Sequence, residues 1–252
     1  MKRIKLIINA DDFGANVVVD EEICRFLDDR RVTSTTILAN GPHFEGAVAA
    51  LKNRPHCSVG VHLNVTEFRP LTKCPGLDYI TNSSGNFSSD LGGLALSALR
   101  PSVRRAIRDE WREQIRAVIA SGISVSHLDS HQHVHTFPPL FPVLKQVQRD
   151  FGIRRIRITR NEPSGKIGRP KRVAKAAWNF CVRNFVRTTT TQGFCSFVEF
   201  LETAAAGCLR YETYEVMVHP GSPQFAQENK SLTESWRDRL PYVFDFISYA
   251  DI

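Results

Sequence analysis

The sequence lacks any stretch that could cross a membrane or direct secretion. No part of its 252 residues approaches the roughly twenty consecutive apolar residues that a transmembrane helix needs. The apolar run 6–8 behind the basic N-terminus is too short for the core of a signal peptide, and acidic residues follow at once. We therefore expect a cytoplasmic protein without an integral membrane segment.

Repeats, linkers and paired cysteines are also missing. There is no internal repeat and no low-complexity segment, so we expect one domain over residues 1–252. The six cysteines are widely spread and include no Cys-x-x-Cys pair, which excludes a zinc ribbon. A chain of this length with 42% hydrophobic residues can build a sizeable core without disulfides, and we expect reduced, mostly buried thiols.

The net charge of +7 is unevenly distributed. The basic excess lies between Arg154 and Arg187 and the rest of the chain is close to balanced, so charge is weak evidence for a nucleic-acid partner and we expect none. Segment 165–187 within this region is basic and partly amphipathic. It predicts a helix with a solvated basic face, and a surface for an anionic partner or a lipid layer is the alternative.

Histidine is concentrated in one place. Four of the eight histidines fall within the nine residues from His127 to His135, which read HLDSHQHVH. Their spacing is mostly two, and alternate side chains of an extended strand share a face. A strand would therefore point five ionisable side chains the same way: His127, Asp129, His131, His133 and His135. Such a group needs a metal, a proton relay or solvent, and we interpret it as one wall of a metal site.

Apolar, β-branched segments alternate with amphipathic ones along the chain. The predicted strands are 5–9, 32–39, 58–63, 123–129, 155–159, 193–197, 215–219 and a short last one at 247–249. The predicted helices are 17–29, 44–52, 103–121, 138–152 and 236–246. This order indicates βαβ units and a mainly parallel sheet, and about seven strands in one domain favour a closed or nearly closed (β/α) barrel. Segment 64–94 is predicted to be an irregular insertion that shapes a site.

Ionisable side chains lie at the carboxyl ends of four predicted strands. They are Asp11 and Asp12 on the first strand, His62 on the third, His131 on the fourth and His219 on the last long one. In a parallel barrel these ends converge on one face. Taken singly, the aspartates could cap the next helix and His62 could be a hydrogen-bonded core residue. Together they suggest a catalytic divalent ion held by one carboxylate and two imidazoles, with a second carboxylate as base and a histidine as acid, hence hydrolysis of an amide or ester.

Five motifs in this order resemble those of the YdjC-type carbohydrate deacetylases, a family that includes chitooligosaccharide deacetylases and hopanoid-associated deacetylases. The resemblance runs from residue 4 to residue 249. The motifs are NADDFG at 9–14, VTSTT at 32–36, GVHL at 60–63, HLDSHQHVH at 127–135 and VHPG at 218–221.

The resemblance implies a deformed (β/α) barrel like that of polysaccharide deacetylases. It also implies removal of an acetyl group from an N-acetylated amino sugar, carried by a chitooligosaccharide or another small glycoconjugate, with one divalent metal ion, Mg²⁺ or Zn²⁺. Asp12, His62 and His131 match the family's metal ligands, Asp11 its general base and His219 its proposed acid. Where the family often has three consecutive histidines, this chain has Gln132, whose side chain should point away from the ligands. A homodimer is left open.

The remaining members of the histidine cluster have supporting roles in this interpretation. We expect His133 and Asp129 to hold ligand tautomers, and His127 and His135 to be structural. A metal-dependent phosphoesterase and a glycoside hydrolase are alternative enzymes, although glycoside hydrolysis normally needs two separated carboxylates. A non-catalytic barrel that binds sugar or nucleic acid is the alternative outside enzymes.

Overall fold

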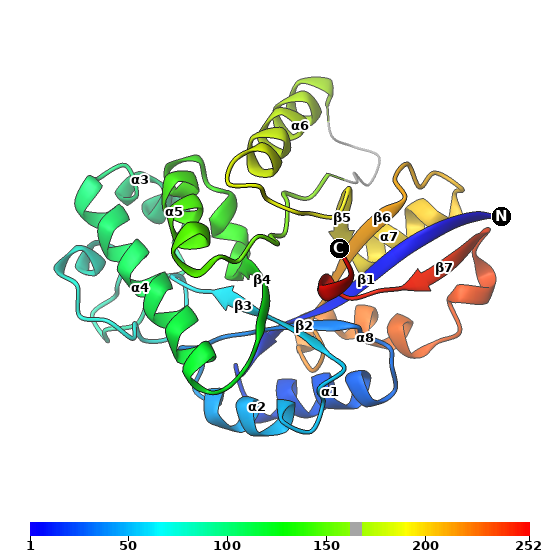
Figure 1. Cartoon of the computed structure of the whole chain (residues 1–252), viewed down its shortest axis with the longest axis horizontal. Helices are drawn as coiled ribbons and strands as arrows, with labels where there is room; N and C mark the ends of the chain where they lie inside the picture. Colours follow the sequence, from blue (N-terminus) through cyan, green and yellow to red (C-terminus); the bar gives the residue numbers. More distant parts are fainter. Residues whose placement is uncertain (162–167) are drawn as a thin grey trace.

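A sheet of parallel strands forms the centre of the molecule (Figure 1). The computed structural model describes residues 1–161 and 168–252, and within them seven strands lie in the order β4-β3-β2-β1-β6-β5, with β7 paired to β1. Their bounds are β1 (Lys2–Phe13), β2 (Ser34–Ile37), β3 (Ser58–Leu63), β4 (Val125–Ser130), β5 (Gly193–Ser196), β6 (Thr213–Val218) and β7 (Tyr242–Phe246). Helices cover the outer side of the curved sheet, so the fold is an α/β half-barrel, as predicted.

The helices of the described residues alternate with these strands. The α-helices are α1 (Val17–Asp28), α2 (Phe44–Leu51), α3 (Leu91–Ser97), α4 (Pro101–Ala120), α5 (Phe141–Phe151), α6 (Arg169–Asn184), α7 (Phe197–Ala205) and α8 (Ala226–Thr233). Short 3₁₀ helices are η1 (Pro75–Tyr79), η2 (His131–Thr136), η3 (Pro138–Leu140), η4 (Pro223–Phe225), η5 (Arg237–Arg239) and η6 (Tyr249–Asp251). No described helix is both long and apolar enough to span a membrane.

The long strand β1 is the axis of the sheet. Its residues 5–10 pair with β6 on one side, while on the other side residues 2–6 pair with β7 and residues 9–13 with β2. Leu6, Ile7 and Ile8 are completely buried, as expected for a strand covered on both faces. Because the strands are parallel, their carboxyl ends meet on one side of the sheet, and the candidate site is built there.

A segment without regular strand structure closes the gap between β4 and β5. Arg157 N donates to Leu128 O on β4 at 3.1 Å, and Ile156 N donates to Thr189 O at 3.1 Å. The strand predicted at 155–159 is therefore wrong as an element, although the segment lies where a strand was expected. At Thr159 the backbone forms its hydrogen bonds with a side chain instead of a neighbouring strand. The Thr159 N–H donates to Asn179 Oδ1, and Asn179 Nδ2 donates to Thr159 O.

The C-terminal predictions are also wrong. Segment 236–246 was predicted to be helical, but it contains η5 and then β7. Tyr242, Phe244 and Phe246 alternate along β7, which is the two-residue period of a strand, and Phe244 and Phe246 pack against Trp236. The short strand expected at 247–249 is absent from the described structure, and η6 begins at Tyr249.

The insertion 64–94 combines irregular chain with core contacts. It contains η1, most of α3 and an isolated bridge between Thr81 and Phe87. Leu77, Ile80 and Phe87 are buried in the core, while the start of the insertion contributes to the site described below. Of the basic segment predicted at 165–187, residues 165–167 lie outside the described residues and most of the rest is α6. The six cysteines form no disulfide with one another.

Candidate metal and catalytic site

The end of β1 directs two adjacent carboxylates toward the same cleft. In a regular strand Asp11 and Asp12 would point to opposite faces. Asp12 instead has a left-handed backbone with φ 69°, and the chain turns there, since Ala15 N donates to Asp12 O at 3.1 Å. Gly14 follows with φ 91°, a conformation that suits glycine. Both carboxylates consequently line the cleft.

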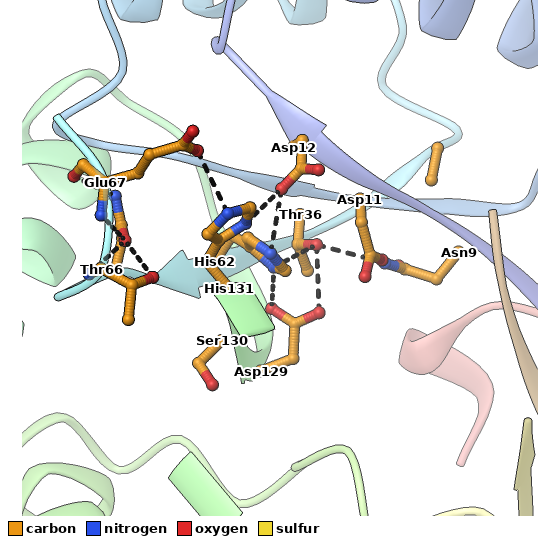
Figure 2. Close-up of polar contacts among 12 residues, drawn as sticks. Asn9, Asp11, Asp12, Thr36, His62, Thr66, Glu67, Asp129, Ser130 and His131 are labelled. Carbon is orange, nitrogen blue, oxygen red and sulfur yellow. Dashed lines mark hydrogen bonds and ion pairs between the residues drawn. The ribbon is translucent and has the colours of Figure 1, made fainter. Parts of the chain in front are cut away.

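Asp12, His62 and His131 meet at the carboxyl ends of β1, β3 and β4 (Figure 2). Asp12 Oδ1 lies 3.2 Å from His62 Nε2 and 2.8 Å from His131 Nδ1. One potential ligand atom from each residue lies within 4.8 Å of the other two. The structure thus brings together, at the ends of three separate strands, the three residues that the sequence assigned to metal binding.

The chemistry of this donor set suits a divalent cation. One carboxylate and two imidazoles leave positions free for water and substrate, as in catalytic sites. Burial alone would raise the pKa of Asp12, but hydrogen bonds from His131 and His62 hold it well below its usual range, so the carboxylate is negatively charged. Glu67, from the insertion, lies 3.1 Å from His131 Nε2 and adds a second carboxylate beside the group (Figure 2).

His62 is fixed by groups behind it. Its Nδ1 lies 2.8 Å from Asp129 Oδ1 and 3.1 Å from Thr36 Oγ1, and that hydroxyl donates to Asp129 Oδ2 at 3.1 Å. These contacts leave Nε2 directed at Asp12. Asp129 therefore orients the imidazole of His62, which the sequence analysis assigned to metal binding. Burial lowers the pKa of His62, but the charge of Asp129 and the bond to Asp12 raise it to about 10.

Arg157 is the residue that the sequence prediction missed. It is completely buried, and it lies between Asp11, Asp129 and Glu215, with nitrogen–oxygen distances of 2.6 to 2.7 Å. Two of its hydrogen bonds are parallel and hold both oxygens of Asp11. An arginine between two isoleucines, Ile156-Arg157-Ile158, on a predicted strand was the available signal, because a buried cation requires acidic partners.

The position of the Arg157 guanidinium also distinguishes between two sets of potential metal ligands. Asp11, His62 and Asp129 likewise place ligand atoms within 4.8 Å of one another. Arg157 Nη1 lies within 2.7 Å of both of these aspartates and already supplies the positive charge there. A second cation would be repelled, so the set containing Asp12 and His131 is the better candidate for a metal site.

The histidine cluster does not form one strand face, so that prediction is wrong beyond residue 130. Strand β4 ends at Ser130, and η2 begins at His131. Gln132 and His133 have left-handed backbones, with φ 52° and 58°. The Ser130 hydroxyl accepts from His135 N at 2.9 Å and lies 2.6 Å from His135 Nδ1, which holds the chain in this turn.

The other three histidines of the cluster lie apart from the ligand group. His127 stacks on Tyr249 with ring centroids 3.6 Å apart, and His135 Nε2 lies 3.0 Å from Arg157 O. Burial lowers the pKa of His127 to about 3 and that of His135 to about 4, so both are neutral and structural, as expected. His133 lines the cleft and meets the ring of Phe194 edge-on, and its expected contact with a ligand is not found.

His219 lies beyond the end of β6 and lines the cleft with the two aspartates. Its ring stacks on Phe225 with centroids 4.0 Å apart, and its backbone N–H donates to Glu228 at 2.6 Å. Nδ1 lies 3.4 Å from the same carboxylate. Burial lowers the pKa of His219, but Glu228 and the charges of Asp11 and Asp12 raise it above its usual value. This shift favours the protonated ring.

A cleft of about 990 Å³ connects these groups. It is lined by β-strand ends, by the insertion and by the loop that leads into α8. Besides the residues already placed, its walls include Asn16, Val18, Phe68, Arg160, Ser196, Met217, Ser222, Pro223 and Gln227. Small-molecule sites span roughly 300 to 1,000 Å³, so this cleft is large enough for a saccharide of several rings.

The fold and the site together define a parallel (β/α) half-barrel with a carboxylate–imidazole cluster at the carboxyl ends of its strands. Residues 5–241 match the family model described as YdjC-like protein, and the chain belongs to this family. A carbohydrate deacetylase of Halalkalibacterium halodurans is 36% identical over 163 residues, 64% of this chain and 67% of the relative. A carbohydrate deacetylase of Brevibacillus brevis is 29% identical over 86% of this chain and 81% of the relative.

Two solved structures share the fold. A proposed cellobiose-phosphate cleavage protein of Enterococcus faecalis has a TM-score of 0.77 at 22% identity, and the match covers 99% of both chains. The catalytic domain of a peptidoglycan N-acetylglucosamine deacetylase of Eubacterium rectale has a TM-score of 0.51 at 12% identity, over 98% of this chain and 89% of that one. At these identities the likeness concerns the fold.

Proposed function

We propose that this YdjC-like protein is a metal-dependent carbohydrate deacetylase that removes the acetyl group from an N-acetylated amino sugar. The observation that carries the proposal is the convergence of Asp12, His62 and His131 in the cleft that Asp11 and His219 also line. The carbohydrate deacetylases among its relatives support the substrate class. We infer chitooligosaccharides as substrates to test first, in a cytoplasmic enzyme that could act as a monomer or a homodimer.

Asp12, His62 and His131 would hold one divalent ion, which when bound would polarise the acetamide carbonyl and make water a stronger nucleophile. Imidazole ligands favour Zn²⁺ or a similar ion, whereas a carboxylate and water also suit Mg²⁺. We propose a single ion of one of these kinds.

Asp11 is the proposed general base. Arg157 and Asn9 hold its carboxylate from behind, with bonds of 2.6 to 2.8 Å, so the side chain cannot turn away from the cleft. It would accept a proton from the attacking water, and Arg157 would stay charged because carboxylates surround it.

His219 is the proposed general acid. Its raised pKa favours the protonated ring, and Phe225 and Glu228 fix the ring's position. The imidazolium would donate its proton to the nitrogen of the departing amino sugar. Two separated carboxylates flanking a glycosidic bond are not what these strand ends offer, so amide hydrolysis fits the site better than glycoside hydrolysis.

Acetate release from diacetylchitobiose tests this function, with protein stripped of metal and then supplied with Zn²⁺ or Mg²⁺. We expect acetate to appear only after an ion is added, with the glycosidic bond intact. Asp11→Asn should abolish turnover and keep the metal content of the wild type, while His219→Gln should lower turnover with metal retained. Cleavage of the disaccharide without acetate release would refute deacetylation, and near wild-type activity of Asp11→Asn would refute the base assignment.

A further inference from the structure

The net positive charge of this protein comes from one segment. Residues 163–198 contain seven Lys and Arg side chains and no Asp or Glu. The remainder of the chain carries 26 basic and 26 acidic residues, so the entire net charge of +7 comes from this segment. Most of it is helix α6 and the turn behind it, which Figure 1 shows at one edge of the molecule.

The outward face of α6 is apolar. Val173, Ala177 and Phe180 follow one another at spacings of four and three, which places them on one side of the helix. The exposed fractions are 67% for Val173 and 64% for Phe180, and Phe185 just behind the helix is 53% exposed. A cluster of large apolar side chains on a basic helix is unusual for a surface that contacts only water.

This apolar face is not the side of α6 that packs on the protein. The inward side is already occupied: Trp178 meets Phe141 edge-on at 5.2 Å, and Asn179 holds the backbone of Thr159. Val182 is 2% exposed. The helix thus has two apolar sides, of which the fold uses one.

A cationic hollow lies beside the helix. It measures about 110 Å³ and has Arg172, Lys175 and Arg183 of α6 on one side and Arg210 on the other. Asn161, Ala176, Asn179 and Tyr211 complete its described lining. Lys175 Nζ donates to Arg160 O at 2.9 Å, and Arg183 Nη2 donates to Gln192 O at 2.9 Å. Burial, together with the neighbouring charges of Lys171 and Arg160, lowers the pKa of Lys175, as expected where positive charges are crowded. The hollow has room for several water-sized groups, such as the oxygens of one phosphate.

We propose that α6 and the turn behind it dock this protein on an anionic lipid surface. The apolar face would enter the interface between headgroups and acyl chains, and the exposed basic side chains of the helix, such as Lys171 and Arg172, would contact the lipid phosphates. This arrangement is that of an amphipathic interfacial helix with basic flanks. The proposal does not depend on the deacetylase function.

Charge complementarity selects the lipid surface over two other occupants. In a symmetric dimer through α6, two segments without a single acidic residue would face each other, and like charges would repel. Nucleic acid would satisfy the basic side chains but would leave Val173 and Phe180 facing phosphates and water. An anionic lipid layer satisfies both kinds of side chain.

The test is flotation of the full-length protein with vesicles. Wild type should float with vesicles of equal parts phosphatidylcholine and phosphatidylglycerol and stay behind with pure phosphatidylcholine. K171Q/R172Q should weaken binding roughly 30-fold, since each basic residue near the surface contributes about fivefold. V173S/F180S should weaken it roughly tenfold or more, because the two side chains are no longer buried in lipid.

L96S/L99S is the matched control, because these leucines are 70% and 60% exposed in another part of the molecule. It should bind anionic vesicles like wild type, and circular dichroism melting should show that all three variants fold. Equal behaviour of wild type on the two kinds of vesicle would overturn the proposal, as would unchanged binding by V173S/F180S. A dimer in sedimentation that V173S/F180S dissociates, without vesicle binding by wild type, would also overturn it and assign the face to a second copy.

Discussion

Arg157 and Asp11 are joined by two parallel hydrogen bonds, from Nη1 to Oδ2 at 2.6 Å and from Nη2 to Oδ1 at 2.7 Å. The pair is inaccessible from the side of the guanidinium, which also contacts Asp129 and Glu215. The orientation of the proposed base is therefore set by a residue of the segment between β4 and β5, 146 positions further along the chain.

We expect Arg157→Lys to distinguish the effect of orienting Asp11 from the effect of the positive charge beside it. Lysine keeps a positive charge but cannot form the two parallel bonds, so kcat should fall roughly tenfold to hundredfold. Metal content should stay at the wild-type level, because Asp12, His62 and His131 are untouched. Acetate-release kinetics and elemental analysis measure the two quantities. An unchanged kcat would mean that Asp11 does not need the two parallel hydrogen bonds from residue 157 to act as the base.

His131→Ala should lose metal, because it removes one of three proposed ligands. We expect affinity for Zn²⁺ to fall at least roughly hundredfold, as measured by competition with a chelating dye. The matched control is His133→Asn, two residues along the same turn, since asparagine tolerates the left-handed backbone there. The control should bind metal like wild type. Full retention of metal by His131→Ala would exclude it as a ligand.

Lys145 gives a pH dependence of stability outside the site. Its ammonium group is buried and donates to Gln148, Val182 O and Thr188, and burial lowers its pKa to about 8. The charged form is disfavoured in the folded state, so this residue destabilises the fold below pH 8, and the penalty disappears as pH rises toward the unfolded pKa. Between about pH 7 and about pH 9.5, the unfolding free energy of wild type should therefore rise by about 2 kcal/mol relative to that of Lys145→Met. Urea unfolding of both proteins at the two pH values measures this difference, and parallel pH curves would contradict it.

Gly60 on β3 leaves room for the ring of His127. A Cβ atom at this position would lie 2.5 Å from His127 Cε1. Because that ring is stacked on Tyr249 and fully buried, it cannot move aside, and Gly60→Ala should cost about 1 to 3 kcal/mol of unfolding free energy. Gly92→Ala is the control, since its Cβ would make only an ordinary contact in helix α3, and it should stabilise by about 0.5 to 1 kcal/mol. Thermal unfolding compares the two variants, and similar melting temperatures would show that the ring has space.

The strand ends were predictable because parallel sheets obey simple rules. The alternation of apolar and amphipathic segments predicted the parallel barrel, and it placed Asp12 and His62 on the same side of the sheet. His131 was found for a reason that is wrong in part, since it follows β4 in a turn instead of extending the strand. His131 nevertheless lies near Asp12 and His62 as predicted, because the first residue after a strand still lies at its carboxyl end.

What sequence could not give depends on contacts between distant residues. Arg157 has partners on β1, β4 and β6, and no local pattern reveals such a convergence. Glu67 reaches His131 from an insertion whose path was not predictable. Helix α7 is different, because Ser196 and Glu199 form a capping box that the sequence displays, and the helix was overlooked.

The irregular segment between β4 and β5 can affect how long the proposed base stays aligned. The segment that carries Arg157 is tied to β4 through two backbone hydrogen bonds of Leu128, and to Thr189 through two more. We expect so short a ladder to open at a lower free energy than the continuous pairing of β1 with β6. Each opening would draw the guanidinium away from the carboxylate of Asp11. Hydrogen exchange at the amides of Ile156 and Arg157 therefore measures how often the proposed base loses its alignment.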